Sequence, residues 1–119
     1  MTQPARGEIW SVLLPAKLND PHQPRPALVV SSDYRNEIAD DVIVVPIFSL
    51  GADGPTHVRV PRGEGGIKRD SVLFCEELTT LELGYLVRGP WGPPVDVATL
   101  RAVARAVRRA IGETVPEPI

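Results

Sequence analysis

The sequence predicts a mostly β fold of the α+β class: a small, partly open antiparallel barrel with one helix at its C-terminal end. Short runs of β-branched residues between Pro- and Gly-rich turns predict the strands. One stretch with helical spacing, after residue 95, predicts the helix. No strand–helix–strand alternation occurs, which argues against a parallel sheet. We expect the 119 residues to form a single domain, 1–119, with a frayed tail over 113–119.

Six strands are predicted, each bounded by turn residues, over 7–14, 27–32, 41–49, 56–60, 71–78 and 85–88. The second has an unbroken apolar run, which predicts burial on both faces. Pro46 lies inside the third strand and predicts a sheet edge or a bulge, because proline cannot donate to a strand ladder. Residues 32–36 between these strands are expected to form a turn or a short helix.

The C-terminal helix is predicted to begin after Asp96 and to stop at Gly112. The Asp96 carboxylate can accept from the first free backbone N–H groups, and glycine favours the conformation that ends a helix. Four arginines lie away from the apolar stripe, at positions 101, 105, 108 and 109. We expect them to form a solvated face, with a nucleic-acid stripe and a subunit contact as the alternatives.

Composition excludes several classes of function. The net charge of −2 gives no overall basic field of the kind that marks many nucleic-acid-binding proteins. The longest apolar run is far below the ~20 residues of a membrane span, and the first residues do not resemble a signal peptide, so we expect no membrane partner. The lone Cys75 cannot form an internal disulfide, which favours a cytoplasmic protein, and it is expected to be a buried small hydrophobe. Since His22 and His57 are isolated, we expect no metal and no cofactor.

Arg25 is the residue whose placement most needs an explanation. It lies between Pro24 and Pro26, each of which fixes its own φ and restricts the residue before it. Arg25 is therefore held extended at the mouth of the second strand. Such an arrangement is useful where a guanidinium must meet a ligand.

An antiparallel pairing of the second and third strands would bring Arg25 close to Ser49. The expected register puts Ala27 near Phe48. Asp20 and His22 precede Arg25 on the same loop. An arginine, a hydroxyl and an acid or histidine could bind and activate a phosphodiester, because the planar guanidinium matches two phosphate oxygens and stabilises transition-state charge.

Four blocks carry a resemblance that covers residues 6–112. They are RGEIWSVLL (6–14), RPALVVSSDYRN (25–36), VIVVPIFS (42–49) and GIKRDSVLFCEELTTLE (66–82). In their order and spacing the chain resembles the MazF/PemK (Kid) family of toxin endoribonucleases. The resemblance implies a conical SH3-like barrel with helices, usually a homodimer.

The resemblance also implies an activity. Family members cut single-stranded RNA at short sequence motifs without metal or ribosome, leaving a 2′,3′-cyclic phosphate and a 5′-OH. A MazE-like antitoxin neutralises them by laying a disordered acidic tail across the RNA groove, where the tail folds as it binds. Dependence on single strands is physically sensible, because side chains cannot read bases through the deep groove of duplex RNA.

By this resemblance Arg25 matches the family's catalytic arginine. Asp20 stands where some members have a glutamate, five residues before the arginine. A family threonine near the end of the third strand aligns with Phe48, which cannot donate to phosphate. We expect Ser49, the next residue, to substitute, with a bulge at Pro46 turning it to the same face.

RNA contacts are predicted at Lys17, His22, Arg62, Lys68 and Arg69, all on loops or turns. Two further positions depart from the family: Glu77 and Thr79 stand where members often have glutamine and a basic residue, which weakens RNA attraction there. Trp10 is expected in the core or at a dimer contact. Trp91 is expected to cover the helix, with stacking on a base as the alternative.

Two other functions remain open on the same barrel. A cleavage-dead RNA-binding domain is favoured by Phe48 at the threonine position. A gyrase-poisoning toxin of the CcdB type would act through protein contact and would not need Arg25.

Overall fold

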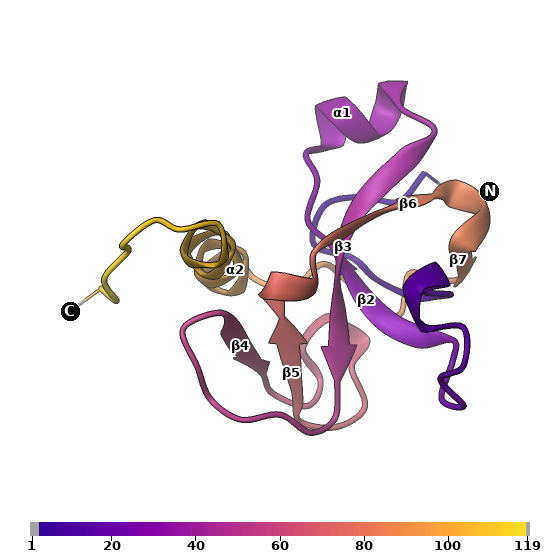
Figure 1. Ribbon diagram of the computed structural model, residues 1–119. Helices are drawn as coiled ribbons and strands as arrows, with labels where there is room; N and C mark the ends of the chain where they lie inside the picture. The colour runs from indigo at the N-terminus through magenta and orange to yellow at the C-terminus, as the bar shows by residue number, and fades with distance from the viewer. Residues whose placement is uncertain (1–2, 119) are drawn as a thin grey trace.

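The computed structural model describes residues 3–118 and contains one strongly bent sheet of seven strands. They are β1 (Ile9–Val12), β2 (Arg25–Val29), β3 (Asp41–Phe48), β4 (His57–Val60), β5 (Ser71–Phe74), β6 (Thr79–Glu82) and β7 (Leu86–Arg88). The pairings are antiparallel and follow the order β4-β5-β3-β2-β1-β7, with β6 also paired to β3 (Figure 1). Because β4 and β7 end this path without meeting, the predicted partly open antiparallel barrel is confirmed.

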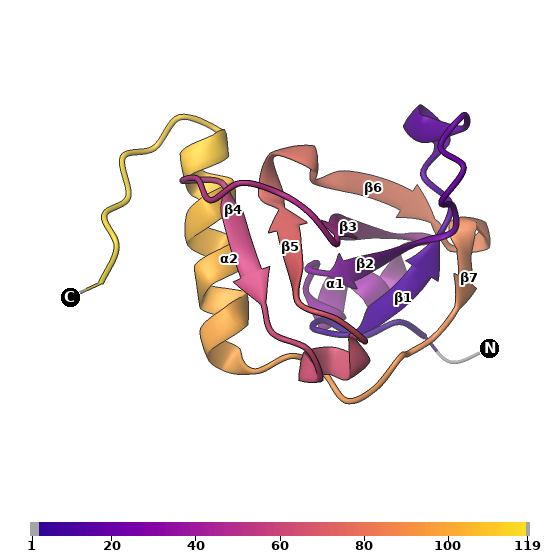
Figure 2. The ribbon, with the colours of Figure 1, turned by 90° about the horizontal axis from the view of Figure 1, so that it is seen from below.

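Two α-helices accompany the sheet. The short helix α1 (Asp33–Ile38) joins β2 to β3, and α2 (Val97–Ala110) lies alongside β4 (Figure 2). Single 3₁₀ turns occur at η1 (Pro15–Lys17), η2 (Glu64–Gly66), η3 (Cys75–Glu77) and η4 (Leu83–Tyr85). The predicted cap is confirmed, since Asp96 Oδ1 accepts from the Thr99 N–H at 2.9 Å. In the described part of the chain, neither helix has the length and apolar character needed to cross a membrane.

The arginines of α2 contact the segment that follows the helix. Arg108 Nε lies 2.6 Å from Glu113 Oε2, and Arg109 Nη2 lies 2.9 Å from Glu117 Oε1. Arg109 also donates to the Pro55 carbonyl of the β3–β4 loop at 3.2 Å. These arginines therefore tie the helix to its neighbours within the chain, while Arg101 is exposed. Residue 119, the end of the predicted tail, lies outside the described residues.

Strand β3 is internal, so the prediction of a sheet edge at Pro46 is wrong. β2 pairs along one side of β3, and β6 and β5 pair along the other. The Ile43 carbonyl accepts from Val30 on the β2 side, so by alternation the Pro46 nitrogen faces the other side. On that side the pairing with β6 covers β3 as far as Val44, and the pairing with β5 covers it from Ile47 onward. Pro46 is tolerated because its nitrogen, which has no N–H to donate, lies at the junction between the β6 and β5 pairings.

The register between β2 and β3 differs from the expected one by two residues. Ala27 pairs with Pro46 rather than lying near Phe48. The difference arises because the chain between the strands folds into α1, which moves the centre of the connection toward the N-terminus. A shift of two residues keeps every side chain on its expected face.

The predicted strand over 71–78 is wrong in its second half. β5 ends at Phe74, η3 follows, and a separate strand, β6, pairs with the first half of β3. The chain must break here because β5 and β6 pair with different halves of the same long strand. Cys75, in η3, is 1% exposed, as expected of a buried hydrophobe, and burial raises the pKa of its thiol to about 12.

Two apolar clusters hold the sheet, one on each face. The first contains Ile9 and Leu28 and packs against α2 through residues such as Val103. The second contains Trp10 and Ala27. Neighbouring residues of a strand enter different clusters because side chains alternate across a sheet. The predicted burial of the second strand on both faces and of Trp10 in the core is therefore confirmed.

Candidate active site

Arg25 is the first residue of β2 and lies at the end of the sheet where β3 finishes. Its guanidinium carbon is 4.7 Å from the centroid of the Phe48 ring, and Phe48 is the last residue of β3. A cation above an aromatic face is attracted by the quadrupole of the ring. Phe48 cannot donate to phosphate itself, but the face of its ring packs against the Arg25 guanidinium and helps to hold it in place.

Asp20 holds Arg25 from the side. Arg25 Nε donates to Asp20 Oδ2 at 2.6 Å, and Arg25 Nη2 lies 3.4 Å from Asp20 Oδ1. The His22 backbone N–H also donates to Asp20 Oδ1, at 2.9 Å, which orders the loop between them. The hydrogen bond from Arg25, followed by that from His22, lowers the pKa of the Asp20 carboxyl.

The ion pair leaves part of the guanidinium available to a ligand. Of the five N–H donors of an arginine, Asp20 engages those on the Nε–Nη2 edge. The structure records no protein partner for Nη1 within residues 3–118, so the outer Nη1–Nη2 edge is open. The side chain remains 20% exposed. Arg25 is thus oriented by an internal ion pair without being closed off by it.

Arg25 lines a cavity of about 340 Å³ at this end of the sheet. It is lined by His22, Arg25, Pro26, Ile47, Phe48, Ser49, Ile67, Lys68, Arg69, Ser71 and Trp91. Five residues singled out from the sequence, Arg25, Ser49, His22, Lys68 and Arg69, are therefore brought together here. The cavity receives its charge from cationic side chains, which suits an anionic ligand.

Ser49 reaches the cavity without the bulge that the sequence analysis expected at Pro46. β3 pairs with β2 as far as Pro46 and with β5 as far as Phe48, and neither ladder shows a shift of register. Since β3 ends at Phe48, strict alternation ends there too, and the exposed Ser49 lines the same cavity as its neighbour.

Two predicted RNA contacts do not line the Arg25 cavity, although Lys17 lies beside it, with Nζ 5.8 Å from the centroid of the Phe48 ring. Lys17 Nζ is 3.1 Å from Glu77 Oε1 and lines a smaller hollow beside Thr79. Arg62 is exposed on the turn after β4, where its backbone N–H donates to Asp70 at 2.9 Å. Neither is among the residues that line the Arg25 cavity. Among residues 3–118, the structure also shows no cluster of three or more His, Cys, Asp or Glu side chains with metal-binding geometry.

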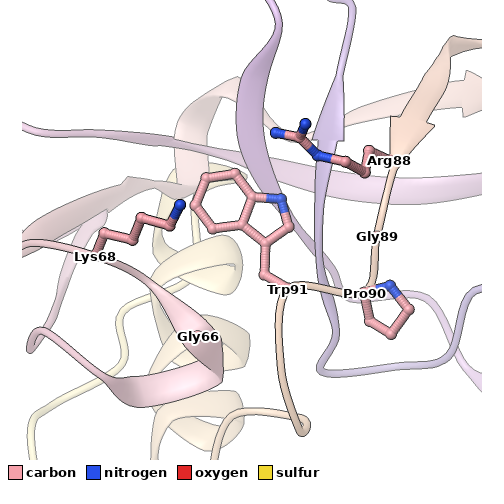
Figure 3. Close-up of a pocket in the computed structure, with 6 residues that line it drawn as sticks. All are labelled: Gly66, Lys68, Arg88, Gly89, Pro90 and Trp91. Carbon is pink, nitrogen blue, oxygen red and sulfur yellow. The ribbon is translucent and has the colours of Figure 1, made fainter.

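A second cavity, of about 350 Å³, adjoins the first and was not predicted. It is lined by Gly66, Lys68, Arg88, Gly89, Pro90 and Trp91 (Figure 3). Arg88 carried no signal in the sequence, because its role depends on β7 lying beside β1. Trp91 was recognised only as a residue with two alternative roles. It lines both cavities, and its Nε1–H donates to Ser11 Oγ at 2.9 Å.

Comparison with known proteins places this arrangement in a family. Residues 5–111 match the family described as PemK-like, MazF-like toxin of type II toxin-antitoxin system. The chain is 31% identical over 80 residues to the endoribonuclease EndoA of Bacillus subtilis strain 168, an alignment that covers 65% of this chain and 69% of EndoA. It is 29% identical over 84 residues to the endoribonuclease MazF of Staphylococcus saprophyticus, covering 68% and 70% of the two chains.

Solved structures show the same fold. An endoribonuclease in complex with its cognate antitoxin from a mycobacterial species aligns with a TM-score of 0.76 at 23% identity, covering 95% of this chain and 99% of that one. MazF of Deinococcus radiodurans aligns with a TM-score of 0.77 at 19% identity, covering 95% and 100%. The resemblance found in the four sequence blocks is confirmed, and the chain belongs to the PemK-like, MazF-like toxins of type II toxin–antitoxin systems.

Proposed function

We propose that this chain, an endoribonuclease of the MazF type, cuts single-stranded RNA at short sequence motifs without a metal ion or the ribosome. The products are a 2′,3′-cyclic phosphate and a 5′-OH end. The observation that carries the proposal is the open outer edge of Arg25, held by Asp20 and Phe48 at the wall of a cationic cavity.

Arg25 binds the scissile phosphate in this proposal. Its Nη1 and Nη2 groups donate to the non-bridging oxygens and stabilise the additional negative charge of the pentacoordinate transition state. The Ser49 hydroxyl lines the same cavity and donates to one of those oxygens. It thereby takes the place of the family threonine that aligns with Phe48.

His22 and Asp20 have different roles in the reaction. The ribose 2′-oxygen forms a bond to phosphorus while the bond from phosphorus to the 5′-oxygen breaks. We assign removal of the 2′-OH proton to the His22 imidazole, which lines the cavity, and protonation of the leaving oxygen to solvent. Asp20 is a positioning residue, because a carboxylate whose pKa is lowered is a weak base and its oxygens already face Arg25.

Metal independence and single-strand preference are supported by the lining of the cavity. Arg25, Lys68 and Arg69 supply the positive charge that a metal ion would otherwise bring to the phosphate, and they repel cations. An open cavity at the end of a sheet admits an unpaired strand, whose bases are free to be contacted.

We further propose a homodimer and a MazE-like antitoxin as partners, with the activity in the cytoplasm, where the transcripts are. Exposed apolar side chains on and beside the edge strand β7, such as Val87 at 55% and Tyr85 at 37%, would be covered by pairing. Support for the antitoxin comes from the family and from the mycobacterial relative solved with its cognate antitoxin.

The proposal is tested by incubating the purified chain with a long single-stranded RNA in EDTA and mapping the cut ends. Discrete cuts with 5′-OH ends are expected from the parent. Arg25→Ala should abolish them while its circular dichroism stays unchanged and its unfolding transition, which reports the loss of the contacts with Asp20 and Phe48, remains cooperative. Cutting by Arg25→Ala at the parent's rate would refute the site. Uncut RNA that is still bound by the parent would indicate a cleavage-dead RNA-binding domain, and no RNA binding at all would favour a CcdB-like protein toxin.

A further inference from the structure

We infer that Trp91, flanked by Lys68 and Arg88, forms a stacking subsite for one unpaired base of the RNA, a nucleotide or more away from the scissile phosphate. This inference deepens the proposed function and rests on it for the identity of the ligand. It assigns the second cavity, which the cleavage chemistry at Arg25 does not use.

The two cavities share a wall, so a single strand can pass from one to the other. Trp91 and Lys68 line both of them, whereas Arg25 lines only the first and Arg88 only the second. A strand whose phosphate lies at Arg25 therefore meets Lys68 and the indole next, and Arg88 beyond. Figure 3 shows the indole of Trp91 between the side chains of Lys68 and Arg88.

The indole is held rigidly before any ligand arrives. The Trp91 backbone N–H donates to the Ile9 carbonyl at 2.9 Å, and the indole Nε1–H donates to the buried Ser11 at 2.9 Å. η2 packs directly on this segment: a Cβ at Gly66, whose φ is +89°, would lie 2.5 Å from the Trp91 carbonyl oxygen. An aromatic platform fixed in this way loses little conformational entropy when a base stacks on it.

The flanking cations are free to meet phosphates. Lys68 and Arg88 are both exposed, and across residues 3–118 the structure records no ion pair or side-chain hydrogen bond for either. Several other basic side chains are neutralised within the chain, as Arg35 is by Asp41 at 2.5 Å and Arg59 is by Asp53 at 2.6 Å. An aromatic face between two unpaired cations is the combination that binds single-stranded nucleic acid, where bases stack and the backbone follows the charge.

Trp91 has part of the covering role that the sequence predicts. The indole packs against the cluster beneath α2 and is half-buried. Cover alone requires only apolar bulk, which leucine supplies. Stacking requires an aromatic ring, which phenylalanine supplies and leucine does not, so the two substitutions separate the roles.

The test in cleavage uses short single-stranded oligonucleotides that contain the motif cut by the parent. One abasic nucleotide is placed at successive positions on each side of the scissile phosphate, and kcat/KM is measured for the parent, Trp91→Leu and Trp91→Phe. We expect one position outside the cleaved dinucleotide where loss of the base costs the parent about tenfold. Trp91→Leu should have lost the sensitivity at that position, mainly through KM, and Trp91→Phe should retain most of it.

A binding measurement keeps the subsite testable even if the chain does not cut RNA. Mixed-sequence 2′-O-methyl oligonucleotides are used as ligands because they lack the attacking hydroxyl and cannot be cut. Stacking of a base on Trp91 should quench the tryptophan fluorescence of the parent. The fluorescence of Trp91→Phe, which retains only the buried Trp10, should not be quenched. Arg88→Gln should weaken this binding several-fold, whereas Arg101→Gln, an exposed arginine on α2, should not.

The outcomes for the two proposals differ. Quenching without cleavage would overturn the proposed function and leave the stacking subsite standing. Cleavage with no abasic position that depends on Trp91, or without quenching, would overturn the subsite and leave the proposed function standing. An equal loss in the Leu and Phe variants would also overturn the subsite, because it would show that Trp91 acts through packing alone.

Discussion

In the proposed mechanism Ser49 does what the resemblance assigns to a threonine, and Phe48, at the aligned position, supports Arg25 instead. Phe48 supports the Arg25 guanidinium with its ring, 4.7 Å away, and Ser49 brings a hydroxyl to the same cavity. The pair can do so because β3 ends between them, which releases Ser49 from the alternation of the strand.

Ser49→Ala tests this division at a single atom. We expect kcat to fall about 100-fold with little change in KM, since one donor to the transition-state oxygens is removed. Single-turnover cleavage of a motif-containing oligonucleotide measures the effect. Ser71→Ala is the matched control. Ser71 lines the same cavity, but its hydroxyl already donates to the Arg69 carbonyl and is not needed by the phosphate. A Ser49→Ala enzyme as fast as the parent would show that Arg25 works without this hydroxyl.

Cys75 is a residue with a structural role only. Burial raises the pKa of its thiol to about 12, with a smaller effect of the Glu76 charge, and the reactive thiolate is therefore scarce at neutral pH. We expect the native protein to resist alkylation by iodoacetamide at pH 8 and to react fully in urea, as measured by mass spectrometry. Rapid labelling of the native protein would contradict the burial of this thiol.

Among the elements, β3 determines where the site lies. Its eight residues pair with β2 on one side and with β6 and then β5 on the other. Three of the strand pairings in the barrel therefore involve this one strand. The Arg25 cavity forms where the end of β3 meets the beginning of β2. β5 begins at the Arg25 cavity with Ser71. At its other end, beside Phe74, lies a different charged cluster formed by His57 of β4 and Glu76 of η3.

That cluster favours the protonated form of His57. Its Nδ1 is 2.7 Å from the Ala52 carbonyl and its Nε2 is 2.9 Å from Glu76 Oε2, so both ring nitrogens face acceptors. The bond to Ala52, then that to Glu76, raises the pKa of His57. Hydrogen bonds from His57 and Thr56 lower the pKa of Glu76 against the opposing effect of burial. The ring also stacks on Phe74, with centroids 4.2 Å apart.

The stability from this pair depends on pH. A raised histidine pKa contributes stability that is complete below the ordinary value of 6.5 and is lost as pH rises through the folded value. Because the pKa of Glu76 is lowered, its ionised form contributes stability that is complete above the ordinary value of 4.5. This stability is lost as pH falls through the folded value. A double-mutant cycle with His57→Gln and Glu76→Gln should therefore give a coupling free energy of about 0.5 kcal/mol at pH 5.5, from urea unfolding, and almost none at pH 9. Equal coupling at both pH values would contradict the ion pair.

At the scale of the whole molecule, RNA binding must overcome a net charge of −2. It can do so because several cations are neutralised by carboxylates elsewhere, while Arg25, Lys68, Arg69 and Arg88 gather around the two joined cavities. The attraction is therefore local, and its salt dependence should report which cations meet phosphate.

Lys68→Gln should reduce the slope of log affinity against log salt by about 0.7, the value for one phosphate contact on a single strand. Lys17→Gln should change the slope much less, because the Lys17 charge is already paired with Glu77 and the side chain does not line the cavity. Fluorescence anisotropy with a 2′-O-methyl oligonucleotide between 50 and 300 mM salt, on the order of the physiological range, measures both. If the two variants change the slope equally, the RNA path runs past Lys17 as well.

The sequence by itself determined the class of fold and pointed to the centre of the candidate site. Alternating and helical patterns, turn residues and the Asp96 cap are local signals, and they predicted the open barrel, the terminal helix and the burial of the second strand. The prolines around Arg25 and four blocks of family sequence predicted which side chain stands at the centre, and the structure places it on an open cavity.

Only the tertiary structure decided how residues far apart in the sequence meet. The break between β5 and β6, the register of Ala27 against Pro46, and the seat of Arg25 on Phe48 all depend on strand pairing, which no local pattern encodes. The same holds for the second cavity, where η2, β7 and the segment of Trp91 come together beside β1. Local sequence sets the conformation of each segment, whereas the neighbours of a segment are chosen by the burial of apolar surface across the whole chain.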